Sequence, residues 1–286
     1  MSNAAHASLQ REAVFMFHIL VASALCASLA AASGDPPFVV ALDPGHGGSN
    51  RGAPTAKAEK YEKHLTIEIA RLVQRRLAGE SGVKVVLCRS SDLLVPIRAR
   101  ARCANQAGAR LFLSIHANAA SADEGPGSQR GFELFVLPTA DVDQEVARAA
   151  LLADDDAQAA WAAHRARSLA ADSLAAARRI RWRLSDALGA DRDRGIKQIG
   201  ATLDVLQGLD MPAVLVEVGF LDHAEEGPFL LSDEGKKAVA AALAGAITDL
   251  RSRELRGQRD PMTTAPSGQR RAAAAKDPTG VSAARP

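Results

Sequence analysis

The sequence predicts an α/β fold, a three-layer sandwich with a mostly parallel central sheet between layers of helices. Apolar runs at residues 38–42, 111–115 and 213–216 have the length and composition of buried parallel strands. The stretches between these runs contain segments with helical spacing of apolar residues and no internal Gly or Pro. Strands that alternate with helices indicate a parallel sheet covered on both faces. With 286 residues, 47% of them hydrophobic, the chain is long enough for one such core.

The first predicted helix, residues 62–77, begins with Glu62. The apolar residues that share a stripe with this glutamate are Leu65, Ile69 and Leu72. Its carboxylate therefore starts on the core-facing side of the helix. His64 falls among the charged positions of the solvent-facing side. We therefore expect Glu62, and not His64, at a functional site.

Further elements are predicted along the rest of the chain. They are a strand at residues 131–137, an acidic, Ala-rich helical insertion at 139–171, a core helix at 174–188, a short extended segment at 201–206, a strand at 213–218 and a terminal helix at 234–250. Together with the elements before them, they make up one predicted catalytic domain at residues 33–250.

Residues with metal-binding side chains end or follow the predicted strands. His46 follows the first apolar run, His116 the second and Glu217 the third. Ligands bind at the carboxyl ends of the strands in open α/β sheets, so these side chains should meet Glu62 at one edge. Two histidines and one carboxylate are a common ligand set for a catalytic zinc, and a further glutamate can handle the proton of its water. The residues therefore predict a zinc hydrolase site at this edge of the sheet.

The residues of this site lie in short motifs that follow one another in a distinctive order. The segments are Asp-Pro-Gly-His-Gly-Gly at 43–48, Glu62 at a helix start, Ser-Ile-His-Ala-Asn at 114–118, Gly-Phe-Glu at 131–133, the region of Arg98, Arg102 and Asn105, and Glu-Val-Gly-Phe-Leu at 217–221. This order resembles the zinc-dependent N-acetylmuramoyl-L-alanine amidases of the amidase-3 type, which are bacterial cell-wall hydrolases, and the similarity covers roughly residues 38–248. As departures, Cys88 stands where a threonine is usual, and Leu-Asp-His at 221–223 replaces a common Leu-Ser-Asn.

The resemblance implies a role for each residue of the site. The zinc ligands that it implies, for one ion per chain, are His46, Glu62 and His116. Glu217 would be the catalytic carboxylate, and we expect Asp43 or Asn118 to orient the ligand histidines. The histidines expected to be ordinary surface residues are His64, His164 and His223.

The implied activity is hydrolysis of the amide between the lactyl group of N-acetylmuramic acid and L-alanine in peptidoglycan, for cell-wall remodelling or daughter-cell separation. A zinc carboxypeptidase-like peptidase could use a similar ligand set. A non-catalytic cell-wall binding protein is another alternative, although binding alone would not need Glu217. The expected partner is peptidoglycan, with room for an activator protein, and we expect a monomer. Aromatic residues make up 4% of the chain and offer no stacking platform, so nucleic-acid binding is not expected.

The two ends of the chain differ from the middle. Residues 1–32 look like an export signal, since an apolar run at 13–32 follows Arg11 and ends in three alanines. The run is also long enough for an uncleaved membrane anchor. Residues 251–286 contain seven Arg and one Lys against three acidic residues and lack apolar periodicity. They predict a disordered basic tail, either simply solvated or weakly attached to an anionic envelope polymer.

Export to the periplasm or cell envelope would place Cys88 and Cys103 in an oxidising compartment. Cys88 ends a predicted strand and Cys103 lies on the helix that follows. The two could form a disulfide, or remain two buried free thiols, because pairing requires Cα atoms within about 7 Å.

The helical insertion at 139–171 is a candidate lid. Some cell-division members of the family carry a helix at the corresponding point that places a carboxylate on the metal until an activator displaces it. Glu145 is the candidate for that carboxylate in this chain, since it would fill the open position of the zinc. The alternative is a plain, solvated surface helix.

Overall fold

The computed structural model describes residues 36–55, 60–138, 147, 151, 155–198 and 204–259. The predicted export signal, Glu145 with most of the insertion before residue 155, and residues 260–286 of the basic tail lie outside the described residues. All the elements below belong to one compact unit that begins at Phe38. Within the described ranges, no helix is both long and apolar enough to cross a membrane.

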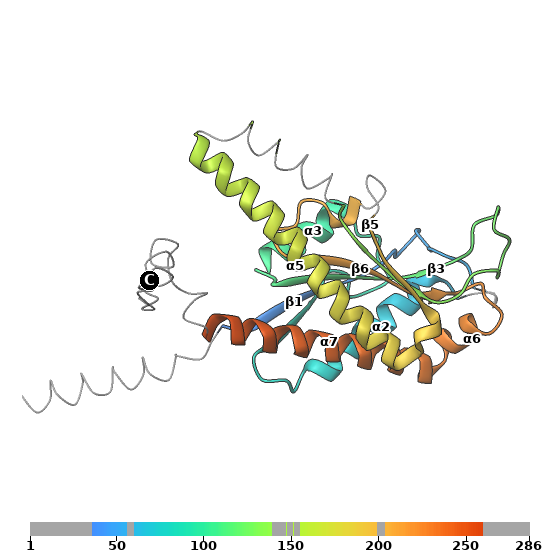
Figure 1. The fold of residues 1–286 in the computed structure, drawn as a ribbon. Coiled ribbons are helices and arrows are strands. Elements are labelled where there is room, and N and C mark those ends of the chain that lie inside the picture. Colours follow the sequence, from blue (N-terminus) through green and yellow to red (C-terminus); the bar gives the residue numbers. More distant parts are fainter. Residues whose placement is uncertain are drawn as a thin grey trace, which may run out of the picture. The chain divides into compact units, whose positions relative to one another are not determined.

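Six strands form the central sheet, in the order β2-β1-β3-β6-β4-β5. Figure 1 shows the sheet among the helices, with β1, β3, β5 and β6 labelled. Their bounds are Phe38–Pro44 for β1, Val83–Leu87 for β2, Leu111–Asn118 for β3, Phe132–Val136 for β4, Asp193–Gln198 for β5 and Ala213–Phe220 for β6. Neighbouring strands among β2, β1, β3 and β6 pair in parallel, whereas β4 runs antiparallel to β6 and parallel to β5. The sheet is mostly parallel, as predicted, and the carboxyl ends of β1, β3 and β6 lie at one edge.

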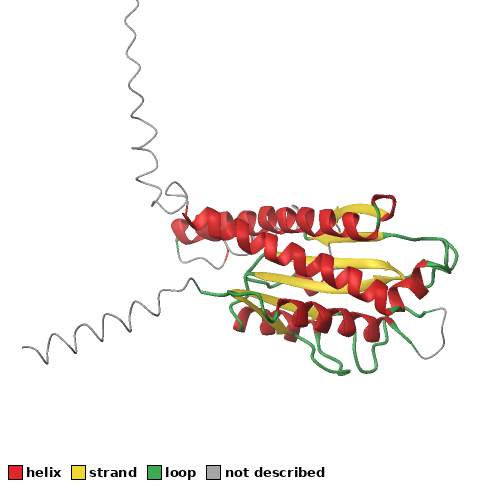
Figure 2. Cartoon of the chain, turned by 90° about the horizontal axis from the view of Figure 1, so that it is seen from below, coloured by secondary structure: helices red, strands yellow, loops and turns green. Residues whose placement is uncertain are grey.

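Helices cover both faces of the sheet, and Figure 2 shows the strands lying between them. The main helices are α2 (Glu62–Leu77), α3 (Ile97–Gln106), α5 (Asp156–Leu188) and α7 (Asp233–Arg259), joined by the short α6 (Glu226–Leu231) and the 3₁₀ helices η1 (Ala190–Arg192) and η2 (Asp204–Leu206). Val40 and Leu42 pack with α2, α5 and α7, whereas Val39 and Ala41 pack with α3 and η2. Because alternate residues of β1 enter two separate cores, the predicted three-layer sandwich is confirmed.

Two helices extend beyond their predicted bounds. α5 runs without interruption from the predicted insertion through the predicted core helix, because no Gly or Pro breaks the stretch. Its start is capped by Asp155, whose side chain accepts a hydrogen bond of 2.7 Å from the Gln158 N–H group. α7 continues past Leu250 to Arg259, so the first part of the predicted tail is helical. Ion pairs of Arg251 with Glu80 and of Glu254 with Arg110 hold this extension to the domain.

Two other segments differ in kind from the prediction. Residues 204–206 form η2 and not part of an extended segment, and residues 201–203 lie outside the described residues. β5 was not predicted at all, since its sequence Asp-Arg-Gly-Ile-Lys-Gln contains a single large apolar residue and so lacks a strand pattern. It is an edge strand that pairs with β4, and long-range pairing of this kind leaves no local signal.

Cys88 and Cys103 form a disulfide, with their Cα atoms 5.7 Å apart. Of the two alternatives left open by the sequence, the structure has the paired one. The bond joins the chain just after β2 to α3.

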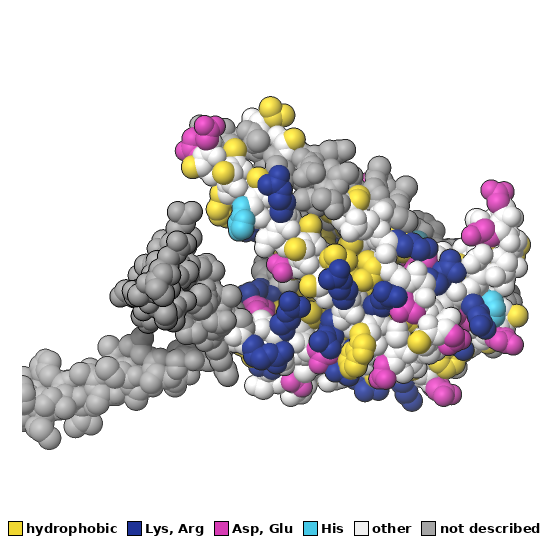
Figure 3. Space-filling model, in the orientation of Figure 1, with side chains coloured by type: hydrophobic (Ala, Val, Ile, Leu, Met, Phe, Trp, Pro, Cys, Tyr) yellow, Lys and Arg dark blue, Asp and Glu magenta, His cyan; other side chains and the backbone are white. Residues whose placement is uncertain are grey.

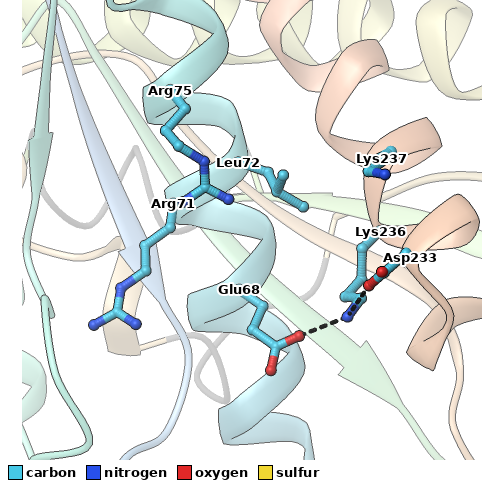
Figure 4. A pocket seen from close by; sticks show the side chains of 7 residues that line it. All are labelled: Glu68, Arg71, Leu72, Arg75, Asp233, Lys236 and Lys237. Carbon is cyan, nitrogen blue, oxygen red and sulfur yellow. Dashed lines mark hydrogen bonds and ion pairs between the residues drawn. The ribbon is translucent and has the colours of Figure 1, made fainter.

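A groove lies on the helical layer between α2 and α7 (Figure 4). Within it, Lys236 Nζ lies 2.8 Å from Glu68 Oε2 and 3.0 Å from Asp233 Oδ1, which links the two helices. Arg71 at the rim donates a hydrogen bond of 2.7 Å to the carbonyl oxygen of Ser90. No residue that lines the groove belongs to the predicted metal site, so this groove is a separate feature.

Candidate metal centre

The three residues predicted as metal ligands come together at the carboxyl edge of the sheet. His46 lies in the loop after β1, Glu62 begins α2, and His116 lies near the end of β3. His46 Nε2 lies 2.8 Å from Glu62 Oε2, and His116 Nδ1 lies 2.9 Å from Glu62 Oε1. The candidate donor atoms all lie within 4.8 Å of one another. These residues could therefore hold a metal ion, and two imidazoles with a carboxylate suit zinc.

Glu62 connects the two histidines and is 3% exposed. Its Oε2 also accepts a hydrogen bond of 2.8 Å from the Ala53 N–H group, and its Oε1 one of 3.0 Å from the Ala117 N–H group. Burial alone would raise the pKa of this carboxyl, but the hydrogen bonds with His116 and His46 outweigh burial and hold the pKa well below its usual range. Glu62 is therefore an ionised carboxylate, the form that binds a cation.

His46 has a left-handed backbone conformation, with φ of 63°, unlike any other non-glycine residue that the structure describes. Its Nδ1 lies 2.8 Å from Asn50 Oδ1, which directs Nε2 toward Glu62. Burial lowers the proton affinity of the ring, but the hydrogen bond and charge of Glu62 outweigh it and raise the pKa of His46 above its usual value. Sequence reasoning missed Asn50, because an asparagine in a Gly-rich turn already has an ordinary explanation.

Two glycines make room for the cluster. A Cβ atom on Gly45 would overlap the His116 ring, and one on Gly52 would overlap Glu62 Oε2. Gly52 also has φ of 69°, where a side chain would be strained. The close approach of backbone to these three side chains therefore requires glycine at both positions.

Asp43 is buried beneath the loop and is linked to His46 through an arginine. Its carboxylate accepts hydrogen bonds from Arg100 Nη1 at 2.6 Å and from Ser114 Oγ at 2.9 Å. Arg100 Nη2 donates in turn to the carbonyl oxygen of His46 at 2.6 Å. Asp43 thus supports the backbone of His46, whereas we expected it to orient a histidine ring.

A second buried arginine, Arg89, holds the same loop. Its Nε donates to the carbonyl oxygen of Pro44 at 3.0 Å and its Nη2 to that of Gly45 at 2.8 Å. Burial lowers the pKa of Arg89 to about 10, which leaves it charged at neutral pH. The motif comparison pointed to the region of Arg98, Arg102 and Asn105 and did not identify Arg89 or Arg100. A local sequence does not indicate which of several arginines will be buried.

Asn118 also differs from its expected role. Its Nδ2 donates to Glu133 Oε1 at 3.0 Å, and its Oδ1 accepts from the Ala119 N–H group at 3.0 Å. These bonds hold Glu133 and the end of β3, and neither involves a histidine ring.

Glu217 lies on β6, between the strands that carry His116 and Glu133. The strand register pairs it with both of these residues. Its Oε2 is buried and has no hydrogen-bond partner among the described residues. Burial, followed by the negative charges of Glu62 and Glu133, raises the pKa of Glu217 well above its usual value. A carboxyl group with this affinity for a proton and no fixed partner is suited to general acid–base chemistry.

The other histidines among the described residues, His64, His164 and His223, lie apart from the cluster. His64 Nδ1 accepts a hydrogen bond of 3.2 Å from the Tyr61 N–H group at the start of α2. His223 Nδ1 accepts two backbone hydrogen bonds, of 3.1 and 3.2 Å, where α6 begins. His164 is exposed on α5. Glu145 lies outside the described residues, so its expected role as a plug stays a prediction.

Comparison with known sequences points to one family. The family described as N-acetylmuramoyl-L-alanine amidase matches residues 40–249. The chain is 28% identical over 227 residues to the N-acetylmuramoyl-L-alanine amidase AmiC of Escherichia coli O6:H1, an alignment that covers 74% of this chain and 52% of that protein. The chain thus spans about half the length of this and other curated relatives that it matches.

Solved structures agree with this comparison. The catalytic domain of CwlV from Bacillus (Paenibacillus) polymyxa var. colistinus is 27% identical with a TM-score of 0.58, and the match covers 75% of this chain and 98% of that one. AmiC2 of Nostoc punctiforme is 26% identical with a TM-score of 0.59, and the match covers 77% of this chain and 99% of that one. The resemblance noted in the motifs is confirmed: the chain belongs to the N-acetylmuramoyl-L-alanine amidase family.

Proposed function

We propose that this protein is a zinc-dependent peptidoglycan amidase, which hydrolyses the amide between the lactyl group of N-acetylmuramic acid and L-alanine. The observation that carries the proposal is the convergence of His46, Glu62 and His116 beside Glu217, whose buried Oε2 lacks a partner among the described residues. Membership of the amidase family supports the choice of this amide.

His46, Glu62 and His116 would hold one zinc ion through Nε2, a carboxylate oxygen and Nδ1, the atoms that face one another in the cluster. Three protein ligands are the usual number in a catalytic zinc site. When bound, zinc would supply an acidified water and polarise the scissile carbonyl.

Glu217 would move the proton. Hydrolysis breaks the C–N bond, adds hydroxyl to the carbonyl carbon and transfers hydrogen to the departing nitrogen of L-alanine. Glu217 would take up a proton from the attacking water at its unpartnered Oε2 and deliver it to that nitrogen. Uptake requires the ionised carboxylate and delivery the protonated one; burial and the charges of Glu62 and Glu133, which raise the pKa of Glu217, favour the second of these states.

Digestion of purified sacculi tests this function, with the products analysed by mass spectrometry with and without a chelator. The amidase should release stem peptides with a free L-alanine amino terminus and lose this activity in the chelator. Loss of a carboxyl-terminal residue without such peptides would favour the carboxypeptidase-like alternative. Binding of sacculi with no new product would favour a cell-wall binding protein.

We also propose that the protein is exported and acts on peptidoglycan in the periplasm or cell envelope. In this proposal it works as a monomer, under the control of an activator protein. The Cys88–Cys103 disulfide supports export, because such bonds persist in oxidising compartments. Thiol labelling of the protein in intact cells should modify neither cysteine until a reductant is added.

A further inference from the structure

Two basic residues on the edge strand β5 share one buried carboxylate. Arg194 Nε donates to Glu133 Oε2 at 2.9 Å, and Lys197 Nζ forms an ion pair with the same oxygen. The other oxygen of Glu133 accepts the hydrogen bond from Asn118. Glu133 is therefore fully engaged, with two cations on one of its oxygens.

In the cluster of Glu133, Arg194 and Lys197, the positive charge exceeds the negative charge. One cation would neutralise the carboxylate, and the second leaves the group with a net charge of about +1. The neighbouring Glu217 forms no ion pair with Arg194 or Lys197 in the described part of the chain. The exposed carboxylate of Glu124 lies within electrostatic range of both cations but forms no ion pair with either among the described residues. A net positive charge at a site built around a buried carboxylate suits an external anion.

The two basic side chains can be reached from solvent, whereas the carboxylate cannot. The side chain of Glu133 is 4% exposed, but those of Arg194 and Lys197 are 29% and 38% exposed. Further contacts hold both side chains in place. Arg194 Nη1 donates a hydrogen bond of 2.9 Å to Gln129 Oε1, and Lys197 Nζ lies over the ring of Phe135. Cations held in place and partly exposed lose little further entropy when they bind a ligand.

The strand register places this cluster beside the candidate metal centre. His116, Glu217 and Glu133 are directly paired on the neighbouring strands β3, β6 and β4. Paired residues point to the same face of a sheet, and neighbouring strands lie about 4.8 Å apart. Because Arg194 and Lys197 reach back to Glu133, their charged groups lie about one strand spacing from the strand of Glu217.

We propose that Arg194 and Lys197 form a subsite for a carboxylate of the stem peptide, on the L-alanine side of the scissile amide. This inference rests on the proposed amidase function. An extended peptide advances about 3.3–3.6 Å per residue, so a carboxylate one or two residues beyond the scissile bond would fall within reach of the cluster. The residue after L-alanine in the stem, when it carries a free α-carboxylate, is the group that fits.

The test uses two synthetic muropeptides that differ at the second stem residue, which carries a free α-carboxylate in one and a primary amide in the other. The zinc-loaded full chain should cleave the carboxylate form with a kcat/KM about tenfold higher, the effect of one charge-assisted hydrogen bond. Lys197→Met and Arg194→Gln should each reduce that preference, mainly through KM. Lys197→Arg should retain most of it, because the charge remains.

The control variant is Arg75→Gln, which removes an equal charge from the groove between α2 and α7 (Figure 4). It should leave the preference unchanged. Equal cleavage of both muropeptides by the unmodified protein would overturn the subsite while leaving the amidase function intact. An equal loss of kcat/KM on both muropeptides in Lys197→Met would have the same meaning. Failure of every variant to cleave either muropeptide at L-alanine would overturn the amidase function and the subsite together.

Discussion

At the scale of single residues, Glu62 organises the candidate metal centre. Each of its carboxylate oxygens is held by one imidazole and one backbone N–H group. The two histidines meet edge to face, with ring centroids 4.9 Å apart. Because these side chains are already held, a metal ion would bind without ordering them further.

His116→Ala should abolish stoichiometric zinc binding and activity, since two remaining ligands seldom hold the ion. Zinc content of the purified variant, measured by elemental analysis, checks this. His64→Ala is the matched control and should keep both, because His64 bonds the backbone of Tyr61 and lies apart from the cluster. Full zinc content in His116→Ala would rule out this ligand set.

Glu217→Gln should keep zinc while kcat falls by about 10²-fold or more, because the amide cannot accept and return a proton. The substitution preserves the shape of the side chain. It also removes a carboxyl group whose ionised form is disfavoured by burial and by the negative charges of Glu62 and Glu133. The variant should therefore fold at least as stably as the parent. Turnover close to normal would exclude Glu217 as the base.

At the scale of elements, the loop after β1 is held from two directions. Arg89 follows the end of β2 and Arg100 lies on α3, and both donate to carbonyl oxygens of the loop that presents His46. The disulfide between Cys88 and Cys103 joins the chain segments that carry these two arginines. The positions of His46 and of the disulfide are therefore coupled through α3.

Replacing both cysteines by serine should lower the free energy of unfolding by about 2–4 kcal/mol, as expected for a closed loop of this size. The sequence separation of the two cysteines is 15. Zinc affinity should also fall, because Arg89 and Arg100 would be less well placed. Denaturant titration and zinc titration measure the two effects. An unchanged zinc affinity in a destabilised variant would show that the disulfide does not support the site.

Glu145→Ala should raise basal hydrolysis of purified sacculi several-fold if the predicted insertion at 139–171 acts as a lid. The physical reason is that a carboxylate in the open position of zinc would exclude the catalytic water. Glu234→Ala, which removes an exposed carboxylate at the start of α7, is the control. Unchanged or lower activity in a folded, zinc-loaded Glu145→Ala variant would leave the plain surface helix as the better interpretation.

At the scale of the whole molecule, basic side chains also gather on a helical face away from the candidate metal centre. The candidate metal ligands occupy the carboxyl edge of the sheet, whereas Lys and Arg side chains gather over the region of α5 and α7 (Figure 3). α5 carries six arginines against three aspartates. This helical face therefore has a positive potential that favours anionic surroundings, without taking part in the metal site.

Removal of zinc by a chelator should lower the melting temperature of the domain. The three ligands come from the loop after β1, from α2 and from β3, so the ion would link separate elements and stabilise the folded state by mass action. Calorimetry with and without chelator measures the shift. His116→Ala should show no chelator-dependent shift, and equal melting temperatures for the zinc-loaded and chelated parent would contradict the prediction.

The sequence by itself determined the fold class, the family and the residues that meet at the candidate metal centre. His46, His116 and Glu217 end or follow buried strands, and Glu62 begins an amphipathic helix, so short local patterns were enough to predict where they lie. Only the tertiary structure decided how they are supported. β5, the burial of Arg89 and Arg100, and the cluster around Glu133 all depend on contacts between residues far apart in the chain, and such contacts leave no periodicity in the sequence.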